Sequence, residues 1–412
     1  MVKKDKLISI LICTILFVWV ALPTGFNVRF GIAINNTLFR FNVWFSIILC
    51  IPLLLLSRNR IAVGKNYRWF LLFILFCVIN TFFHLLNQSS ISVSTGIDAI
   101  LTLVLPFVLV KNFSSLNDLM NRKLVIAFLK VLGVYLILQV FFTSFIATFR
   151  GWDSSVDLER TSTTLGESNC TAYFLTGIAV LLVVEYLNFR KKLDLILLVF
   201  VSLAILLSQT RGAVGLLILI FAVSVLFGNS KGKLRLVLFG IIALFGIYFT
   251  NPEVFYNLYL RIFTGQSSGS DMARELYRST ALAEFSKRPI TGSGMGLLVY
   301  RLSRINRYIT DIPNPHNQWA SLLAETGIMG TVLFVFSQIS IIKRSLHESK
   351  NVRVIAICFL LYLVFGFMFE AMFTAEIRAS LCFWIYWILI EYYRAIDGEL
   401  DEGFNYRSMG YR

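Results

Sequence analysis

The chain has 412 residues, of which 57% are apolar and only 15% are charged. A soluble domain has about 25% charged and about 45–50% apolar residues. This composition excludes a soluble globular enzyme, a disordered chain and a small disulfide-stabilised secreted module, and it indicates an integral membrane protein. The formal net charge of +15 then fits basic cytoplasmic loops better than nucleic-acid binding. The six cysteines form no CxxC pair and are expected to be buried apolar side chains.

Apolar runs long enough to cross a bilayer recur along the chain. A transmembrane helix needs about 20 mostly apolar residues. The predicted fold class is therefore an all-α integral membrane protein with about twelve transmembrane helices. They are centred on residues 7–22, 42–57, 68–86, 98–110, 124–147, 169–189, 193–209, 212–228, 233–250, 317–341, 353–373 and 377–393.

The distribution of basic residues orients these spans. With a cytoplasmic N-terminus, seven inner segments hold 23 Lys and Arg residues and five short outer segments hold six. This bias follows the positive-inside rule and predicts that both termini are cytoplasmic. Met1–Leu22 resembles a signal peptide, but no small-x-small cleavage site follows, so we expect it to stay as the first span. Lys130, inside a span, is interpreted as snorkelling from the span end.

The predicted organisation has four parts. Residues 1–250 hold transmembrane helices 1–9, residues 251–316 form a large extracytoplasmic loop, residues 317–393 hold helices 10–12, and residues 394–412 form a cytoplasmic tail. Connections as long as this loop usually carry function or are disordered.

The large loop has helical and basic features. Residues 252–263 predict a short interfacial helix, and a second helix is expected to start at Asp271 and stop before Pro289. Arg274 and Arg278 lie four residues apart and share a face of it, where two like charges cost a few tenths of a kcal/mol. An anion between them would remove that cost. A solvated basic face is the alternative interpretation.

A glycine-rich run and three arginines follow that helix. Gly292, Gly294 and Gly296, in GSGMG, predict a sharp turn or a close approach of helices, because no strand–helix unit surrounds them as a nucleotide fingerprint requires. Arg301, Arg304 and Arg307 are spaced three apart, on roughly one helical face.

His316 stands where the chain re-enters the membrane, and a histidine there can accept a proton near neutral pH. In the span that follows, Gly327 and Gly330 are expected to form a small face for tight helix packing. Glu325 is interpreted as a packing hydrogen-bond partner, with a proton relay as the alternative. Arg211 occupies a tight outer turn, either snorkelling to lipid phosphate or holding a fork for a bidentate phosphate contact.

These residues resemble the motifs of the O-antigen ligase and O-antigen polymerase superfamily of membrane glycosyltransferases. His316-Asn317, nine further residues and then residues 327–330 (GIMG) are similar to its HN-x9-GxxG signature. TRGA around Arg211 resembles its SRGA-type motif. The run from Arg274 to Gly294 resembles its R-x2-W … P-x2-G-x-G segment, with a tyrosine in place of the tryptophan. Residues 160–172 (RTSTTLGESNCTA) are similar, more loosely, to its R-x-x-G … N-x-x-A stretch.

The resemblance implies a GT-C-like bundle and a metal-independent glycosyltransferase with no cofactor. It implies action at the outer face of the bacterial cytoplasmic membrane, on a glycan linked to undecaprenyl pyrophosphate. By motif, His316 would be the general base, and Arg211, Arg274 and the neighbouring Arg278 would bind the pyrophosphate. Further substrate contacts would come from Arg160, Asn169, Asn317, Arg301 and Arg304. Implied partners are the lipid-linked oligosaccharide, a polysaccharide acceptor, membrane lipids, a flippase and a chain-length regulator, with no nucleic acid.

The residues themselves agree with arginine as the counter-charge. A diphosphate leaving group gains negative charge, which a metal or arginines must stabilise. Metal sites need clustered carboxylates, yet no outer segment holds a DxD pair, while arginine is abundant there. Single displacement, with inversion at the anomeric carbon, is the expected course.

The acceptor is left open by the sequence. A polymerase transfers the growing glycan to the next lipid-linked repeat unit, whereas a ligase transfers it to a lipid A core or another acceptor. We favour the polymerase, because no soluble domain that could recruit a protein acceptor is attached. A twelve-span transporter of lipid-linked sugars is the competing class, but the two halves of the chain show no similarity of the kind many transporters have.

Overall fold

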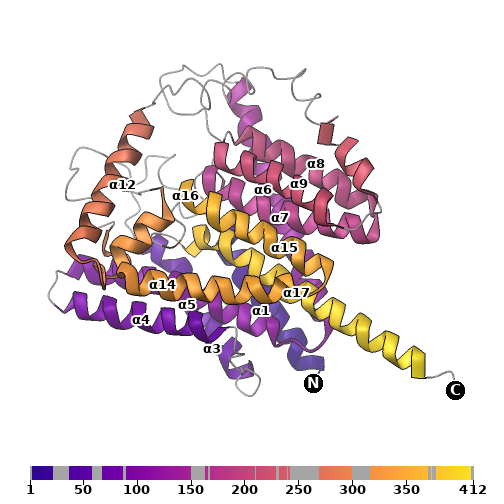
Figure 1. Cartoon of the computed structure of the whole chain (residues 1–412), viewed down its shortest axis with the longest axis horizontal. Coiled ribbons are helices and arrows are strands. Elements are labelled where there is room, and N and C mark those ends of the chain that lie inside the picture. Colours follow the sequence, from indigo (N-terminus) through magenta and orange to yellow (C-terminus); the bar gives the residue numbers. More distant parts are fainter. Residues whose placement is uncertain are drawn as a thin grey trace.

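The fold is almost entirely helical over the residues that the computed structural model describes (Figure 1). These are residues 2–21, 37–57, 67–86, 90–149, 163–165, 168–208, 210–228, 232–238, 240–241, 269–298, 316–369, 373 and 377–409. The longer helices of the first half are α1 (Val2–Ala21), α3 (Thr37–Ser57), α4 (Arg68–Leu85), α5 (Ser90–Ser114), α6 (Leu119–Phe149), α7 (Ser168–Phe189), α8 (Lys192–Leu207) and α9 (Arg211–Phe227). The second half contains α12 (Gly269–Lys287), α14 (Gln318–Leu346), α15 (Lys350–Leu361), the π-helical turn η2 (Tyr362–Gly366), α16 (Phe367–Phe369) and α17 (Ile377–Met409).

Several of these helices can cross a membrane. In lipid, every backbone polar group needs an internal partner, which a helix supplies and an open strand does not. Among the described residues, six helices are long and apolar enough to span: those in residues 68–85, 96–114, 119–144, 168–189, 318–346 and 350–369. The prediction of an all-helical membrane protein is confirmed, whereas the count of twelve spans stays a prediction. The ninth predicted span, residues 233–250, lies mostly outside the described residues.

One end of the bundle gathers the starts of α4 and α6 and the C-terminal part of α17. Tyr67, just before α4, donates a hydrogen bond to Glu391 of α17. Arg394 of α17 donates to Glu348, between α14 and α15, at 2.9 Å. Arg122 of α6 donates to the Glu391 carbonyl at 3.1 Å. We call this the basic end, because the segments predicted to be inner, which hold most of the Lys and Arg residues, meet here.

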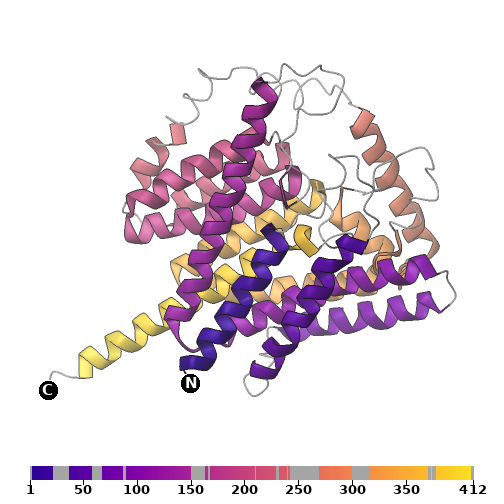
Figure 2. The same cartoon turned by 180° about the vertical axis from the view of Figure 1, so that it is seen from behind.

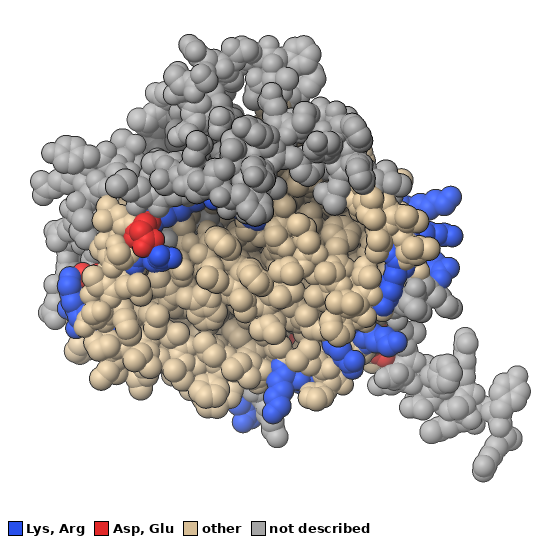
Figure 3. Space-filling model, turned by 45° about the horizontal axis from the view of Figure 1, so that its top comes forward, with Lys and Arg blue, Asp and Glu red and all other residues tan. Residues whose placement is uncertain are grey.

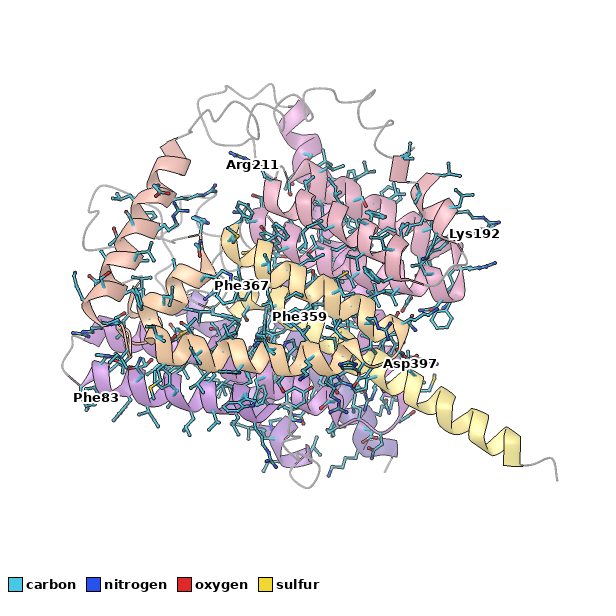
Figure 4. All side chains as sticks on the ribbon, in the orientation of Figure 1. Phe83, Lys192, Arg211, Phe359, Phe367 and Asp397 are labelled. Carbon is cyan, nitrogen blue, oxygen red and sulfur yellow. The ribbon has the colours of Figure 1, made fainter. Side chains whose placement is uncertain are left out.

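The opposite end gathers segments predicted to be outer, and we call it the histidine end. Thr164 donates to a carbonyl near the end of α1, at 2.7 Å. Thr210, before α9, donates to Asn169 of α7 at 3.1 Å. The Gln318 side chain of α14 accepts a hydrogen bond from the Phe373 amide at 2.9 Å. Figure 4 places Arg211 and Phe83 on this side and Lys192 and Asp397 on the other.

α7 is the central helix of the bundle. Every residue from Ser168 to Leu187 is buried, so no face of α7 over these residues meets lipid. α17 packs beside it and fills the core with aromatic rings: Trp384 and Trp387 both lie edge-on to Phe70 of α4, with ring centroids 5.2 and 5.0 Å away. Beyond the bundle α17 continues as a helix to Met409, across much of the predicted tail (Figure 1).

Lys130 corrects an interpretation made from the sequence. Its side chain is one-fifth exposed and pairs with Glu185 of α7 and with Asp194 of α8, the latter at 2.9 Å. Both carboxylates are buried. The lysine therefore does not snorkel to lipid headgroups but joins α6, α7 and α8 near the basic end.

The surface matches a membrane environment. Large apolar side chains are exposed along the spanning helices, including Phe82, Phe83, Leu138 and Phe336. Figure 3 shows that Lys and Arg lie mainly around the edges of the face in view and leave its middle almost free of charge. All six cysteines are free and buried, as predicted.

Candidate functional site

His316 lies directly before α14, and its backbone is unusual. Its φ is 47°, in the left-handed region that residues other than glycine rarely adopt. Asn317 caps the helix by accepting a hydrogen bond from the Ala320 amide at 2.9 Å. Trp319 donates from its indole to the Leu363 carbonyl at 3.2 Å. The start of α14 is therefore held in one place, with a half-buried histidine at its tip.

Arg211 is the first residue of α9 and is half-buried. The residue before it, Thr210, makes no side-chain cap on the helix, and its hydroxyl donates to Asn169. The α9 N-terminus therefore directs backbone N–H groups and the positive end of its dipole toward the histidine end. Figure 4 shows the Arg211 side chain extending from there toward the side on which α12 lies.

The arginine helix of the loop packs against the first turns of α14. Tyr277 and Ala281 of α12 form a small apolar cluster with Ala320 and Ala324 of α14 and with Leu298. Arg274 is one turn before Tyr277, and His316 is one turn before Ala320. α12 ends at Lys287, and Pro289 just after it accepts a hydrogen bond from the Ile328 amide of α14. The two helices therefore run in the same direction along this contact, and Arg274 and His316 lie toward the same end of it.

Arg278 differs from Arg274 in its surroundings. It forms an ion pair with Glu275 at 2.7 Å, and both side chains are about half exposed or more (49% and 62%). Arg274 is half-buried. The cost of two neighbouring like charges is thus relieved by Glu275 and needs no bound anion. Arg278 fits the alternative of a solvated basic face, while Arg274 is the better placed of the two for a substrate.

The predicted helix runs over Gly269–Lys287 and stops before Pro289, as expected; it starts two residues before Asp271. Gly292, Gly294 and Gly296 all have positive φ, at 71°, 97° and 75°. The expectation of a sharp turn at close approach is confirmed.

Gly327 corrects the expectation for the GxxG pair. It does not lie on a helical face with Gly330, because its φ of 61° and ψ of −168° interrupt α14. Glu325, just before this break, is fully buried, near the backbone amides of Gly296 and Leu298. Neither of its carboxylate oxygens completes a hydrogen bond of normal geometry with the described residues.

Three predicted contact residues, Arg160, Arg301 and Arg304, lie outside the described residues, as does the predicted interfacial helix 252–263. Asn169 is described and buried, and it accepts the hydrogen bond from Thr210, the residue before Arg211. The three arginines therefore stay predictions.

One pair at the histidine end was missed by the sequence reasoning. Arg288, just after α12, lies 3.0 Å from the Nδ1 atom of His84 at the end of α4. The alternation of inner and outer segments had already placed the end of the third span outside, so His84 could have been grouped with His316. No local pattern pointed to Arg288. Among the described residues, no group of three His, Cys, Asp or Glu side chains could hold a metal ion.

Comparison with known proteins agrees with the motifs. Residues 196–335 match the model of the O-antigen ligase family. The matched segment includes Arg211, α12 and the His316 end of α14, so it contains most of the residues described above. A search of the curated proteins found no match. The chain is therefore a multi-pass membrane protein whose residues 196–335 are similar to the O-antigen ligase family, and this similarity suggests an enzyme that processes glycans at a membrane.

Proposed function

We propose that the protein is a polysaccharide polymerase. It would transfer a glycan from undecaprenyl pyrophosphate to the next lipid-linked repeat unit, at the outer face of the bacterial cytoplasmic membrane. The observation that carries the proposal is the strained backbone of His316 at the tip of α14, beside the helix that bears Arg274. Sparsely populated backbone conformations persist where surrounding structure over-determines them and often mark functional sites.

In this proposal His316 takes the proton from the acceptor hydroxyl. The hydroxyl oxygen forms a bond to the anomeric carbon while the bond from that carbon to the pyrophosphate oxygen breaks. The electron pair leaves with the pyrophosphate, and the anomeric centre inverts. A positioned base of this kind contributes about 10²–10⁴-fold to the rate.

The leaving pyrophosphate would be stabilised by Arg211, Arg274 and the N–H groups at the start of α9. An uncapped helix N-terminus with an arginine at its first position favours an anion. Guanidinium groups bind phosphate oxygens in a bidentate manner, which a single ammonium cannot do. The counter-charge in this mechanism comes from side chains of the protein, so transfer should survive chelation of divalent metals.

The alternative function is ligation to a lipid A core or another acceptor. The name of the matching family, O-antigen ligase, favours it. The site would be the same in both reactions, and only the acceptor would differ.

The test is reconstitution of the purified protein in nanodiscs with a lipid pyrophosphate-linked repeat unit as the sole substrate. A ladder of products on a gel supports the polymerase. Transfer that appears only after a lipid core acceptor is added supports the ligase. Absence of transfer in both cases contradicts the proposal.

Two histidine variants sharpen this experiment. His316→Asn removes the base, and asparagine tolerates positive φ, so the backbone of this position should survive. We expect no ladder from it. His347→Ala removes the histidine at the opposite end of α14 and is the matched control, which should produce a normal ladder.

A further inference from the structure

The break in α14 leaves four backbone groups without their helical partners. In a continuous helix the Ile328 amide would bond to the Ala324 carbonyl, and the Met329 amide to the Glu325 carbonyl. Gly327, with φ 61° and ψ −168°, interrupts both bonds. In a spanning segment each unsatisfied group would cost several kcal/mol.

The loop that follows α12 supplies all four partners. The Ser293 amide donates to Ala324 O and the Gly294 amide to Glu325 O, both at 2.9 Å. In the other direction, the Ile328 amide donates to Pro289 O at 2.8 Å and the Met329 amide to Ile290 O at 3.1 Å. The loop therefore lies in the break like a short strand and replaces the missing helical bonds.

Glycine on each side makes this approach feasible. A Cβ at Gly292 would overlap backbone atoms of Glu325 and Thr326, and one at Gly327 would overlap backbone atoms of Ile290 and Gly292. Both glycines also have positive φ. Two backbones thus meet directly, with no flexible side chain between them to absorb a shift.

α4 fixes the same point from a third direction. The Asn80 amide nitrogen donates to Thr291 O at 2.7 Å and to Glu325 O at 3.3 Å, so it bonds to both the loop and the broken helix. Next to it, the hydroxyl of Thr81 accepts from the Met295 amide at 2.8 Å. Asn80 is 7% exposed and Thr81 is fully buried.

We infer that residues 289–295, the break at 324–329, and Asn80 with Thr81 form a rigid joint that sets Arg274 and His316 relative to each other. Arg274 is on the helix that leads into this α12–α14 joint, and His316 stands just before the half-helix of α14 that also leads into it, residues 318–326. Asn80 is then a positioning residue, far from the reacting atoms in sequence and acting through the two backbones it holds. The inference rests on the proposed function of those two residues.

The kinetic test compares Asn80→Ala with Asn188→Ala. Misplacement of a reacting group by about 1 Å costs roughly 10²-fold in rate, so we expect Asn80→Ala to lower kcat about 10- to 100-fold, while KM for the lipid-linked donor stays near that of the wild type. Asn188→Ala is the matched control, because it removes the same side chain and two similar hydrogen bonds at the basic end. It should leave kcat unchanged. Thr81→Val, which is isosteric, is the second variant should Asn80→Ala fail to fold.

Hydrogen exchange tests the joint without relying on activity. The amides of Ser293, Gly294, Ile328 and Met329 should exchange slowly in the wild type in nanodiscs, and faster in Asn80→Ala or Thr81→Val. Exchange in the wild type as fast as in exposed loops would overturn the joint. Faster exchange in a variant whose kcat matches the wild type would overturn the positioning role. A wild type with protected amides but no transfer would overturn the proposed function and, with it, the positioning role, while the joint itself would stand.

Discussion

Arg211 carries the sharpest residue-scale test of the proposed mechanism. A hydrogen bond to a charged group contributes about 1.5–3 kcal/mol, which corresponds to roughly a 10- to 100-fold change in rate. We expect Arg211→Ala to lower kcat by this factor. Arg211→Lys should recover little of the loss, because an ammonium cannot form the bidentate contact. Single-turnover rates in nanodiscs would measure both. Full recovery by lysine would mean that charge alone matters.

The close neighbours of Gly212 explain why a glycine follows Arg211. A Cβ at this position would overlap the hydroxyl oxygen of Tyr173 on α7 and lie 3.0 Å from the ring of Phe369. Overpacking of this kind costs about 1–3 kcal/mol. We therefore expect Gly212→Ala to lower the midpoint of thermal unfolding in detergent, and Tyr173→Phe in the same protein to restore part of it.

Gly215 is the matched control, one turn further along α9. A Cβ there meets nothing within 4 Å. Glycine to alanine in an open helix position stabilises by about 0.5–1 kcal/mol, so Gly215→Ala should raise the midpoint. A fall of equal size in both variants would contradict the packing argument.

At the scale of elements, the ion cluster of Lys130 joins three helices. Removing one partner of a buried pair leaves an uncompensated charge and costs about 3–5 kcal/mol. Lys130→Met should therefore lower the free energy of unfolding strongly, since two buried carboxylates would remain. The check is denaturant unfolding in detergent micelles.

Lys287 offers the comparison for that variant. Its ion pair with Glu284 joins a lysine that is 66% exposed to a carboxylate that is 8% exposed. Water screens the charge of this lysine, and its removal leaves one carboxylate without its partner instead of two. Lys287→Met should therefore lower the free energy of unfolding less than Lys130→Met. Equal losses in the two lysine variants would show that the burial of Lys130 adds nothing.

The sequence predicted helix ends and turns correctly where a proline or glycine in the same segment determines the backbone conformation. The sequence predicted a helix that stops before Pro289, because proline cannot continue it, and α12 ends at Lys287. The glycines at 292, 294 and 296 predicted a sharp turn or a close approach of helices, and their positive φ values are ones that only glycine adopts without strain.

The partners of these patterns could not be predicted. The local sequence GSGMG does not indicate that this segment lies against a break in α14. The two segments are distant in sequence, and they pair through backbone N–H and C=O groups, which carry no residue-specific signal. Gly327 was for the same reason assigned to a helical face. Lys130 was misread because its carboxylates belong to two other helices.

At the scale of the whole molecule, charge counting and three-dimensional structure agree on two ends. The segments predicted to be inner meet through Tyr67, Glu391, Arg394 and Glu348. The segments predicted to be outer meet around Asn169 and Gln318. The sidedness in the membrane is a separate matter, which the positive-inside rule predicts: the basic end should face the cytoplasm.

Cysteine labelling would determine that sidedness. Ser279→Cys puts a thiol on an exposed position of α12, near the histidine end, and Lys192→Cys puts one at the start of α8, at the basic end. All six native cysteines are buried, so they should react slowly and give a low background. A membrane-impermeant maleimide should label Ser279→Cys in intact spheroplasts, and Lys192→Cys only after permeabilisation. The reverse pattern would place His316 and Arg211 in the cytoplasm, where a glycan already carried across the membrane could not reach them, and the proposed polymerase would fail for that reason alone.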